Sequence, residues 1–184
     1  IWMRLLKKVD GSVLWIYKPN KWVEKNLQKE AFKRGVLTNR LVFAEKVPHP
    51  VHLARQRLAD VLLDTFNSSA GVTAGDALWA GLPVVTKLGK NFSARASGYM
   101  LASIEMPELI TKTEQEYETL LLDLATNPQR LSTINDKLRA NRLSTPLFNS
   151  KLFTKHLENA YQQAYQQYFA GKDPKDISVP MILT

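Results

Sequence analysis

Short apolar runs alternate with amphipathic stretches along the first half of the chain. Residues 12–17, 41–44, 61–63 and 84–86 form apolar runs bounded by polar or glycine-containing segments, a pattern typical of buried parallel strands. Between them, residues 22–35, 50–57 and 73–80 carry apolar side chains at helical spacing. Strands joined by single helices run parallel with right-handed crossovers, so the sequence predicts an α/β fold with a Rossmann-like parallel sheet.

The second half of the chain has a helical pattern throughout. We expect helices at residues 93–104, 113–126, 128–143 and 149–170, and Thr113 with Glu116 fits a capping box at the start of the second. Residues 1–6 have the pattern of the middle of a helix, which favours a piece of a longer protein. These patterns predict one folded unit over residues 1–170, followed by a loose tail at residues 171–184.

The net charge favours phosphate-bearing partners. The 184 residues include 25 Lys and Arg against 17 Asp and Glu, a formal charge of +8. The basic residues look scattered, no basic run interleaved with aromatic residues stands out, and no apolar stretch reaches the roughly 20 residues of a membrane span. We therefore expect neither a nucleic acid nor a membrane as partner.

Trp15, Trp22 and Trp79 lie in apolar patterns and are expected in the core.

The absence of cysteine excludes disulfides and thiolate metal sites. It also allows a reducing compartment, and we expect a cytoplasmic protein. The sequence has no Asp-x-Asp motif and no cluster of histidines and carboxylates, so neither a metal nor another cofactor is expected.

A candidate binding site follows the third predicted strand. In parallel sheets of this kind, ligands bind beyond the carboxyl ends of the strands. Residues 67–75 are almost all small, and they open the helix that contains Asp76. The N-terminus of that helix offers unpaired N–H groups to a phosphate, Thr73 adds a hydroxyl, and Asp76 is placed to accept hydrogen bonds from ribose. The pattern alone equally allows a plain turn, with Asp76 only complementing the helix dipole.

A longer stretch of the sequence favours a nucleotide site over a plain turn. Residues 52–66 (HLARQRLADVLLDTF) and 73–86 (TAGDALWAGLPVVT) closely resemble the catalytic region of the protein O-GlcNAc transferase family. The resemblance continues upstream at residues 12–15 and downstream at residues 92–95, 107–110 and 144–149. Members of that family join a tetratricopeptide-repeat array to a two-lobed GT-B glycosyltransferase. The resemblance implies that this chain is the C-terminal, donor-binding lobe.

The resemblance also assigns roles to individual residues. It implies that His52 and Arg55 lie beside the uridine and that Asp76 holds the ribose. Gly71, Val72 and Thr73 would form the phosphate-binding turn, and Val47 and His49 would lie near the base. Arg95 would have a supporting role. The catalytic general base is unknown here, because the resemblance places it in an N-terminal lobe upstream.

Several positions depart from the family pattern. His49 stands where relatives often carry lysine, Gly71 where many carry histidine, and Val72 in place of a threonine. Residues 67–69 replace the more usual Pro-Tyr-Asn. These changes leave reduced or altered use of the donor open.

The resemblance implies inverting transfer of N-acetylglucosamine from UDP-GlcNAc to Ser or Thr hydroxyls of proteins, without a metal. The expected partners are a UDP-sugar, an acceptor protein, and the N-terminal lobe and repeat region of the full-length chain. The lobe alone is expected to be inactive. Two alternatives stay open: a nucleotide-sugar-binding module without catalysis, and a related transferase that uses another donor, such as GDP-fucose.

Overall fold

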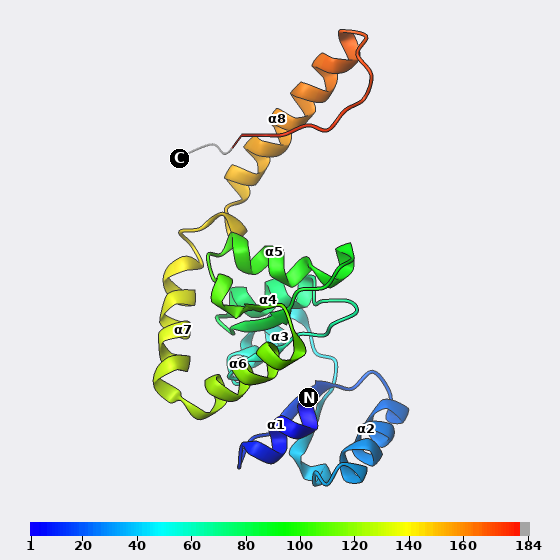
Figure 1. The fold of residues 1–184 in the computed structure, drawn as a ribbon, viewed down its shortest axis with the longest axis vertical. Helices are drawn as coiled ribbons and strands as arrows, with labels where there is room; N and C mark the ends of the chain where they lie inside the picture. The colour runs from blue at the N-terminus through cyan, green and yellow to red at the C-terminus, as the bar shows by residue number, and fades with distance from the viewer. Residues whose placement is uncertain (181–184) are drawn as a thin grey trace.

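The computed structural model describes residues 1–180, in which helices flank two small parallel sheets (Figure 1). The strands are β1 (Leu14–Tyr17), β2 (Leu41–Ala44), β3 (Leu62–Leu63), β4 (Val84–Lys87) and β5 (Ile110–Thr111). β1 pairs with β2, and β4 lies between β3 and β5. Every pair is parallel, which confirms the predicted α/β class. The prediction of one sheet is corrected to two, because no hydrogen-bonded ladder joins β1 to β3 within the described residues.

The first sheet belongs to residues 1–46, which we call the basic region. This region also contains α1 (Trp2–Lys8), α2 (Lys21–Lys33) and the short η1 (Thr38–Arg40). The side chain of Asn20 caps α2 by accepting hydrogen bonds from the N–H groups of Trp22 and Val23, both at 3.0 Å. The buried core of this region is small and consists of Leu6, Ala31, Val36 and Leu41.

The second sheet belongs to residues 47–149, which we call the cored region. Its helices are α3 (His49–Gln56), α4 (Val72–Ala80), η2 (Phe92–Ala94), α5 (Ala96–Ser103), η3 (Pro107–Leu109), α6 (Glu114–Thr126), α7 (Pro128–Asn141) and η4 (Pro146–Phe148). Its core is a cluster of 16 buried residues, among which Leu78, Val84, Val85, Leu101 and Leu138 are fully buried. One of the 16 is Leu5 of α1, in the basic region, whereas its neighbour Leu6 packs into the smaller cluster.

The predicted helices are present, with small shifts at their ends. The capping box of α6 is confirmed, since the Thr113 hydroxyl accepts the Glu116 N–H at 3.1 Å and the Glu116 carboxylate accepts the Thr113 N–H. α4 ends at Ala80 and is capped by Gly81, whose φ of +89° is a left-handed conformation that glycine adopts without strain. The predicted helix at residues 93–104 is divided into η2 and α5. The sequence analysis missed β5, which is two residues long.

The last helix, α8 (Ser150–Phe169), projects away from the rest of the molecule (Figure 1). Beyond it, residues 172–180 form no helix or strand, and residues 181–184 of the predicted tail lie outside the described residues. None of the helices within residues 1–180 is long and apolar enough to cross a membrane.

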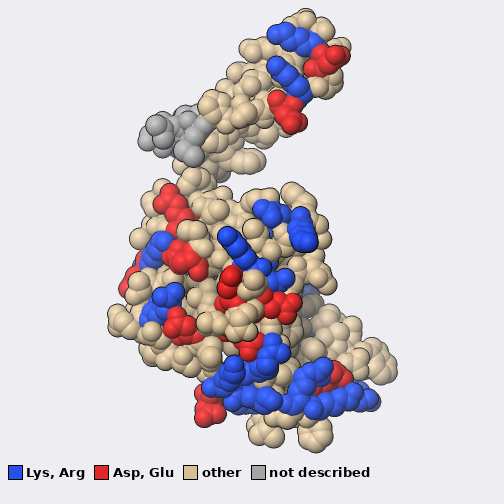
Figure 2. Space-filling model, in the orientation of Figure 1, with Lys and Arg blue, Asp and Glu red and all other residues tan. Residues whose placement is uncertain are grey.

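The basic residues are concentrated, so the prediction of a scattered distribution is wrong. The basic region holds 11 of the 25 Lys and Arg but only four of the 17 Asp and Glu, which gives it +7 of the net +8 charge. Figure 2 shows Lys and Arg gathered over the end of the molecule formed by α1 and α2. α1 contributes basic residues without any acidic one, and the helical repeat of α2 brings its lysines, four residues apart, onto one side.

The tryptophans are less buried than predicted. Trp22 is 61% exposed and Trp79 is 45% exposed, so the expected core positions are wrong for both. Trp22 lies on the solvent side of α2 because Val23, Leu27 and Ala31 occupy the side that faces the core. Trp79 packs one edge against Phe148, with 5.1 Å between ring centroids. Trp15 is partly buried under the guanidinium of Arg55.

Candidate functional site

The N-terminus of α4 presents unpaired backbone donors. Gly71 occupies the N-cap position and contributes no side-chain cap. Its carbonyl accepts the N–H groups of Ala74 and Gly75 at 3.0 and 3.2 Å. Within residues 1–180, the N–H groups of Val72 and Thr73 have no hydrogen-bond partner, and Val72 is 81% exposed. Two donors at the positive end of a helix form a suitable place for an anion.

The loop before this helix is fixed by a buried carboxylate, Asp64, at the carboxyl end of β3. One carboxylate oxygen accepts the N–H groups of Thr65 and Ala70 at 2.8 and 2.7 Å, and the other accepts the Thr86 hydroxyl of β4 at 2.6 Å. The Asp64 carbonyl accepts the hydroxyl of the buried Tyr117 at 2.9 Å. Asp64 is 2% exposed, so it acts as a rigid support for the start of α4.

Ser97 of α5 holds the same loop from the other side. Its hydroxyl donates to the carbonyl of Ala70 at 2.7 Å, directly before Gly71. Ser69 is bound in turn to the carbonyl of Ser93 through both its N–H and its hydroxyl, each at 2.8 Å. The sequence analysis gave no role to Asp64 or Ser97. An acidic residue directly after a buried strand was the available signal for Asp64, whereas Ser97 gave none.

His52 and Arg55 form a connected pair on α3. The Arg55 Nε donates to His52 Nδ1 at 3.2 Å, so a neutral His52 carries its ring proton on Nε2. His52 Nε2 lies 2.9 Å from the Gln56 amide, whose Oε1 is otherwise buried without a partner. Because amide nitrogen and oxygen are interchangeable in such positions, we assign Gln56 Oε1 as the acceptor of this proton.

Arg55 is held in place by three elements. It donates to the carbonyl of Glu45 at 2.8 Å, contacts His52 on its own helix, and lies over the ring of Trp15 at 5.8 Å from the centroid. A guanidinium fixed in this way loses little conformational freedom when it binds a ligand.

A cleft of about 240 Å³ brings the two helices of the site together. His52 and Arg55 line it from α3, and Thr73 lines it from α4. Trp15 and Tyr17 of β1 also line it. Three of the residues assigned from the sequence therefore share one cavity.

His49 and Asp76 meet beside this cleft. The His49 Nε2 lies 3.1 and 3.2 Å from the two carboxylate oxygens of Asp76, across the contact between α3 and α4. The His49 side chain is 63% exposed and that of Asp76 is 20% exposed. A ribose whose hydroxyls donate to the Asp76 carboxylate must therefore bind beside the His49 ring or displace it.

The remaining predicted residues lie around this group. Val47 is half-buried in the loop before α3. A Cβ added at Gly71 would meet nothing within 4 Å, so the position has room for a larger side chain. Arg95 stands apart: it donates to the Tyr99 hydroxyl at 2.9 Å and to the Gly89 carbonyl at 3.0 Å, and thereby braces the loop after β4.

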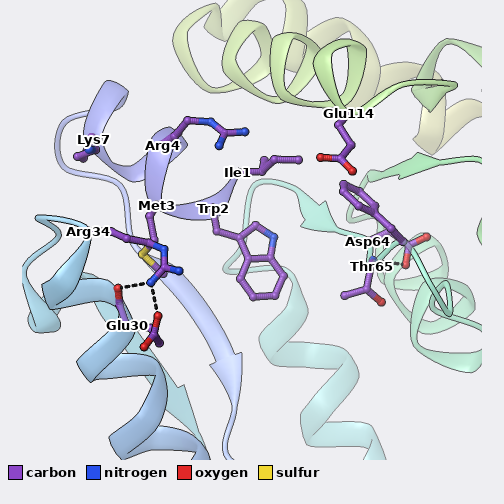
Figure 3. A pocket seen from close by; sticks show the side chains of 11 residues that line it. Ile1, Trp2, Met3, Arg4, Lys7, Glu30, Arg34, Asp64, Thr65 and Glu114 are labelled. Carbon is purple, nitrogen blue, oxygen red and sulfur yellow. Dashed lines mark hydrogen bonds and ion pairs between the residues drawn. The ribbon is translucent and has the colours of Figure 1, made fainter.

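A larger cavity of about 690 Å³ lies between α1, α2 and the end of β3 (Figure 3). Its guanidinium groups are engaged with carboxylates, Arg34 with Glu30 and Arg4 with Glu118. Among the described residues that line it, Lys7 is the cation without a carboxylate partner. We place the candidate site at α3 and α4 because the unpaired helix donors are there.

Residues 1–180 contain no group of three or more His, Cys, Asp or Glu that could hold a metal ion.

Comparison with known proteins identifies the family. Residues 1–157 match the model of glycosyl transferase family 41. The chain belongs to this family. It is 31% identical over 171 residues to the UDP-N-acetylglucosamine--peptide N-acetylglucosaminyltransferase of Caenorhabditis elegans, which covers 93% of this chain and 15% of that protein. It is 30% identical over 179 residues to the probable UDP-N-acetylglucosamine--peptide N-acetylglucosaminyltransferase SEC of Arabidopsis thaliana, covering 97% of this chain and 18% of that protein.

A solved structure agrees with this assignment. The fold superposes on a mutant O-GlcNAc transferase of Thermobaculum terrenum with a TM-score of 0.84 and 28% identity, over 90% of this chain and 32% of that one. The likeness to the protein O-GlcNAc transferase family inferred from sequence is thereby confirmed. The chain spans less than a fifth of the length of these two curated relatives.

Proposed function

We propose that residues 1–170 form the donor-binding lobe of a protein O-GlcNAc transferase, with residues 171–184 as a tail. The observation that carries the proposal is the uncapped N-terminus of α4, with Asp76 one turn further along the helix and His52 and Arg55 across the cleft. A nucleoside diphosphate sugar presents a diphosphate, a ribose and a base in that order. The backbone donors, the carboxylate and the α3 side chains match these three groups.

In this proposal, the diphosphate of UDP-GlcNAc lies on the N–H groups of Val72 and Thr73, with the Thr73 hydroxyl as a further donor. Asp76 accepts the ribose hydroxyls, and His52 and Arg55 lie beside the uridine. Val47 and His49 border the base, Gly71 lets the backbone approach the phosphates, and Arg95 supports the neighbouring loop.

The proposed reaction is attack of a protein Ser or Thr hydroxyl on the anomeric carbon of N-acetylglucosamine. The bond from that carbon to the β-phosphate oxygen breaks, and UDP departs with the bonding electrons. The N-terminus of α4 stabilises the charge that develops on the phosphate. The hydroxyl proton passes to a base in the N-terminal lobe, so the full-length chain, with its repeat region and an acceptor protein, is required. We propose the cytoplasm as its location.

Isothermal titration calorimetry with UDP tests the proposal. Asp76→Asn and His52→Ala should each weaken UDP binding by about ten- to a hundredfold, the range expected for lost hydrogen bonds to charged groups. Asp136→Asn is the matched control, since that exposed carboxylate pairs with Arg139 on α7 and should not affect UDP.

Competition between nucleotides and an activity assay separate the alternatives. UDP should bind more tightly than GDP, and the intact protein should glycosylate a Ser- or Thr-containing peptide with UDP-GlcNAc. Tighter binding of GDP would favour another donor, and UDP binding without peptide glycosylation would favour a module without catalysis. Undiminished UDP affinity in both site variants would contradict the assigned site.

A further inference from the structure

The outward side of α2 combines lysines with exposed aromatic rings. At 3.6 residues per turn, six exposed side chains fall within roughly 120° of the helix circumference. These six residues, which we call the lysine–aromatic face, are Lys21, Trp22, Lys25, Lys29, Phe32 and Lys33. The opposite side of α2 packs Leu27 and Ala31 into the small core. Packing within the described molecule therefore leaves this face uncovered.

The charge on this face is largely uncompensated. Within residues 1–180, Lys21, Lys25 and Lys29 form no ion pair with a carboxylate. Glu24 of the same helix is bound to Lys18, at 2.8 Å, and Glu30 pairs with Lys33 at the edge of the face. The lysines follow one another every four residues, which is about 6 Å along the axis. A row of cations at this spacing fits a surface that carries many anionic groups.

The aromatic rings lie at the two ends of this row. Trp22 is 61% exposed and Phe32 is 73% exposed. They are ten residues apart, about 15 Å along the helix. Lys21 also lies over the Trp22 ring, with its Nζ 5.1 Å from the centroid. Tryptophan and phenylalanine beside lysines are typical of helices that lie at a lipid interface, where rings enter the headgroup layer and lysine stems extend toward the phosphates.

We propose that the lysine–aromatic face is a docking surface for an anionic lipid bilayer, with α2 lying parallel to the membrane plane. The face is the convex side of a helix, whereas a single-stranded nucleic acid is usually bound in a groove. Its cations are lysines, which act as point charges toward a diffuse anionic surface, and it contains no arginine for bidentate contacts to phosphates or bases. Four lysines near such a surface are each attracted to it.

This proposal revises the expectation that no membrane is a partner. It requires no membrane-spanning helix, because the contact is peripheral. Two statements of the sequence analysis change with it: the net charge is concentrated in the basic region, and aromatic residues are interleaved with lysines on α2.

Cosedimentation of the intact protein with vesicles tests the proposal. The protein should bind vesicles that contain phosphatidylserine, bind pure phosphatidylcholine weakly, and lose binding as salt is raised. Each lysine should contribute about fivefold in partitioning, so changing Lys21, Lys25, Lys29 and Lys33 together to Gln should abolish measurable binding. Changing the same four to Arg should retain it.

A matched control separates this face from net charge. Changing Lys151, Lys155, Lys172 and Lys175 to Gln removes the same charge from α8 and the segment after it, and should leave vesicle binding intact. Replacing Trp22 and Phe32 with Ala should leave a weaker interaction that is more easily reversed by salt. Unchanged UDP affinity in every variant shows that the lobe is folded and keeps this test separate from the proposed function.

Three results would overturn the proposal. The first is an absence of binding to phosphatidylserine vesicles by the unaltered protein. The second is an equal loss of binding in the α2 variant and the α8 control. The third is binding of single-stranded RNA through the four lysines in place of vesicles, which would assign the face to a nucleic acid.

Discussion

The basic region and the cored region divide two tasks within one α/β lobe. The basic region has a cluster of four buried residues and carries a charge of +7, whereas the cored region supplies all but one of the 16 residues of the main cluster and residues 47–184 carry only +1. The candidate site on α3 and α4 belongs to the well-packed side. Burial therefore supplies rigidity to the N–H groups of the candidate site, while the lightly packed region carries most of the net charge on its surface.

The largest difference should appear when each core is damaged by the same substitution. Leu101→Ala, at a fully buried position of the large cluster, should lower the free energy of unfolding by about 3–5 kcal/mol. Leu6→Ala, in the small cluster, should cost about 2 kcal/mol, because few neighbours surround the space it leaves. Urea unfolding monitored by circular dichroism measures both values, and a larger cost for Leu6→Ala would reverse the comparison.

A smaller effect is expected from the support beneath α4. Asp64→Ala leaves the N–H groups of Thr65 and Ala70 without their acceptor and should cost about 1–3 kcal/mol in unfolding free energy. It should also weaken UDP binding, because the start of α4 loses its fixed position. Thr86→Val removes only the hydrogen bond from the Thr86 hydroxyl to the other carboxylate oxygen of Asp64, so it is the milder variant. If Asp64→Ala unfolds too easily for calorimetry, Thr86→Val should still show a reduced UDP affinity with near-normal unfolding.

The smallest effect concerns the ion pair that joins the two regions. Arg4 of α1 donates to Glu118 of α6 through Nε and Nη2, at distances from 2.6 to 3.1 Å. The hydrogen bond and charge of Arg4 lower the pKa of Glu118 below its ordinary value of 4.5. A lowered folded-state pKa means that this contribution is present above pH 4.5 and is lost as the pH falls through the folded pKa.

Glu118→Gln should therefore flatten the acid limb of the stability curve. Thermal midpoints measured between neutral pH and pH 3 should converge for the variant and the original protein at the acid end. Glu108→Gln is a suitable control, because Glu108 pairs with Lys137 inside the cored region. A midpoint difference that persists unchanged into acid would mean that Arg4 does not act through the charge of Glu118.

The sequence predicted the elements better than their contacts. The run at residues 84–86 is buried on both sides in the structure, and such a strand is visible as an unbroken apolar segment. β5 was missed because two residues after a Pro-containing turn give no periodicity. Trp22 was misplaced because helical spacing identifies an amphipathic helix without stating which side a large ring takes.

The site was predictable only where its contacts are local. Gly71, Thr73 and Asp76 lie on one helix start, and their spacing indicated a nucleotide site. The hydrogen-bond contact between His49 and Asp76 joins residues 27 positions apart, and the hydrogen bond from Thr86 to Asp64 joins residues 22 apart. Such contacts depend on which elements become neighbours, and no pattern along the chain specifies them.

The central claim is that the free N–H groups at the start of α4 bind a diphosphate. Nuclear magnetic resonance of the backbone amides of Val72 and Thr73 during titration with UDP tests it most directly. The account predicts large shifts of both amides with UDP and much smaller shifts with uridine, which lacks the phosphates. Saturable UDP binding that leaves both amides unmoved would contradict the account and place the diphosphate elsewhere.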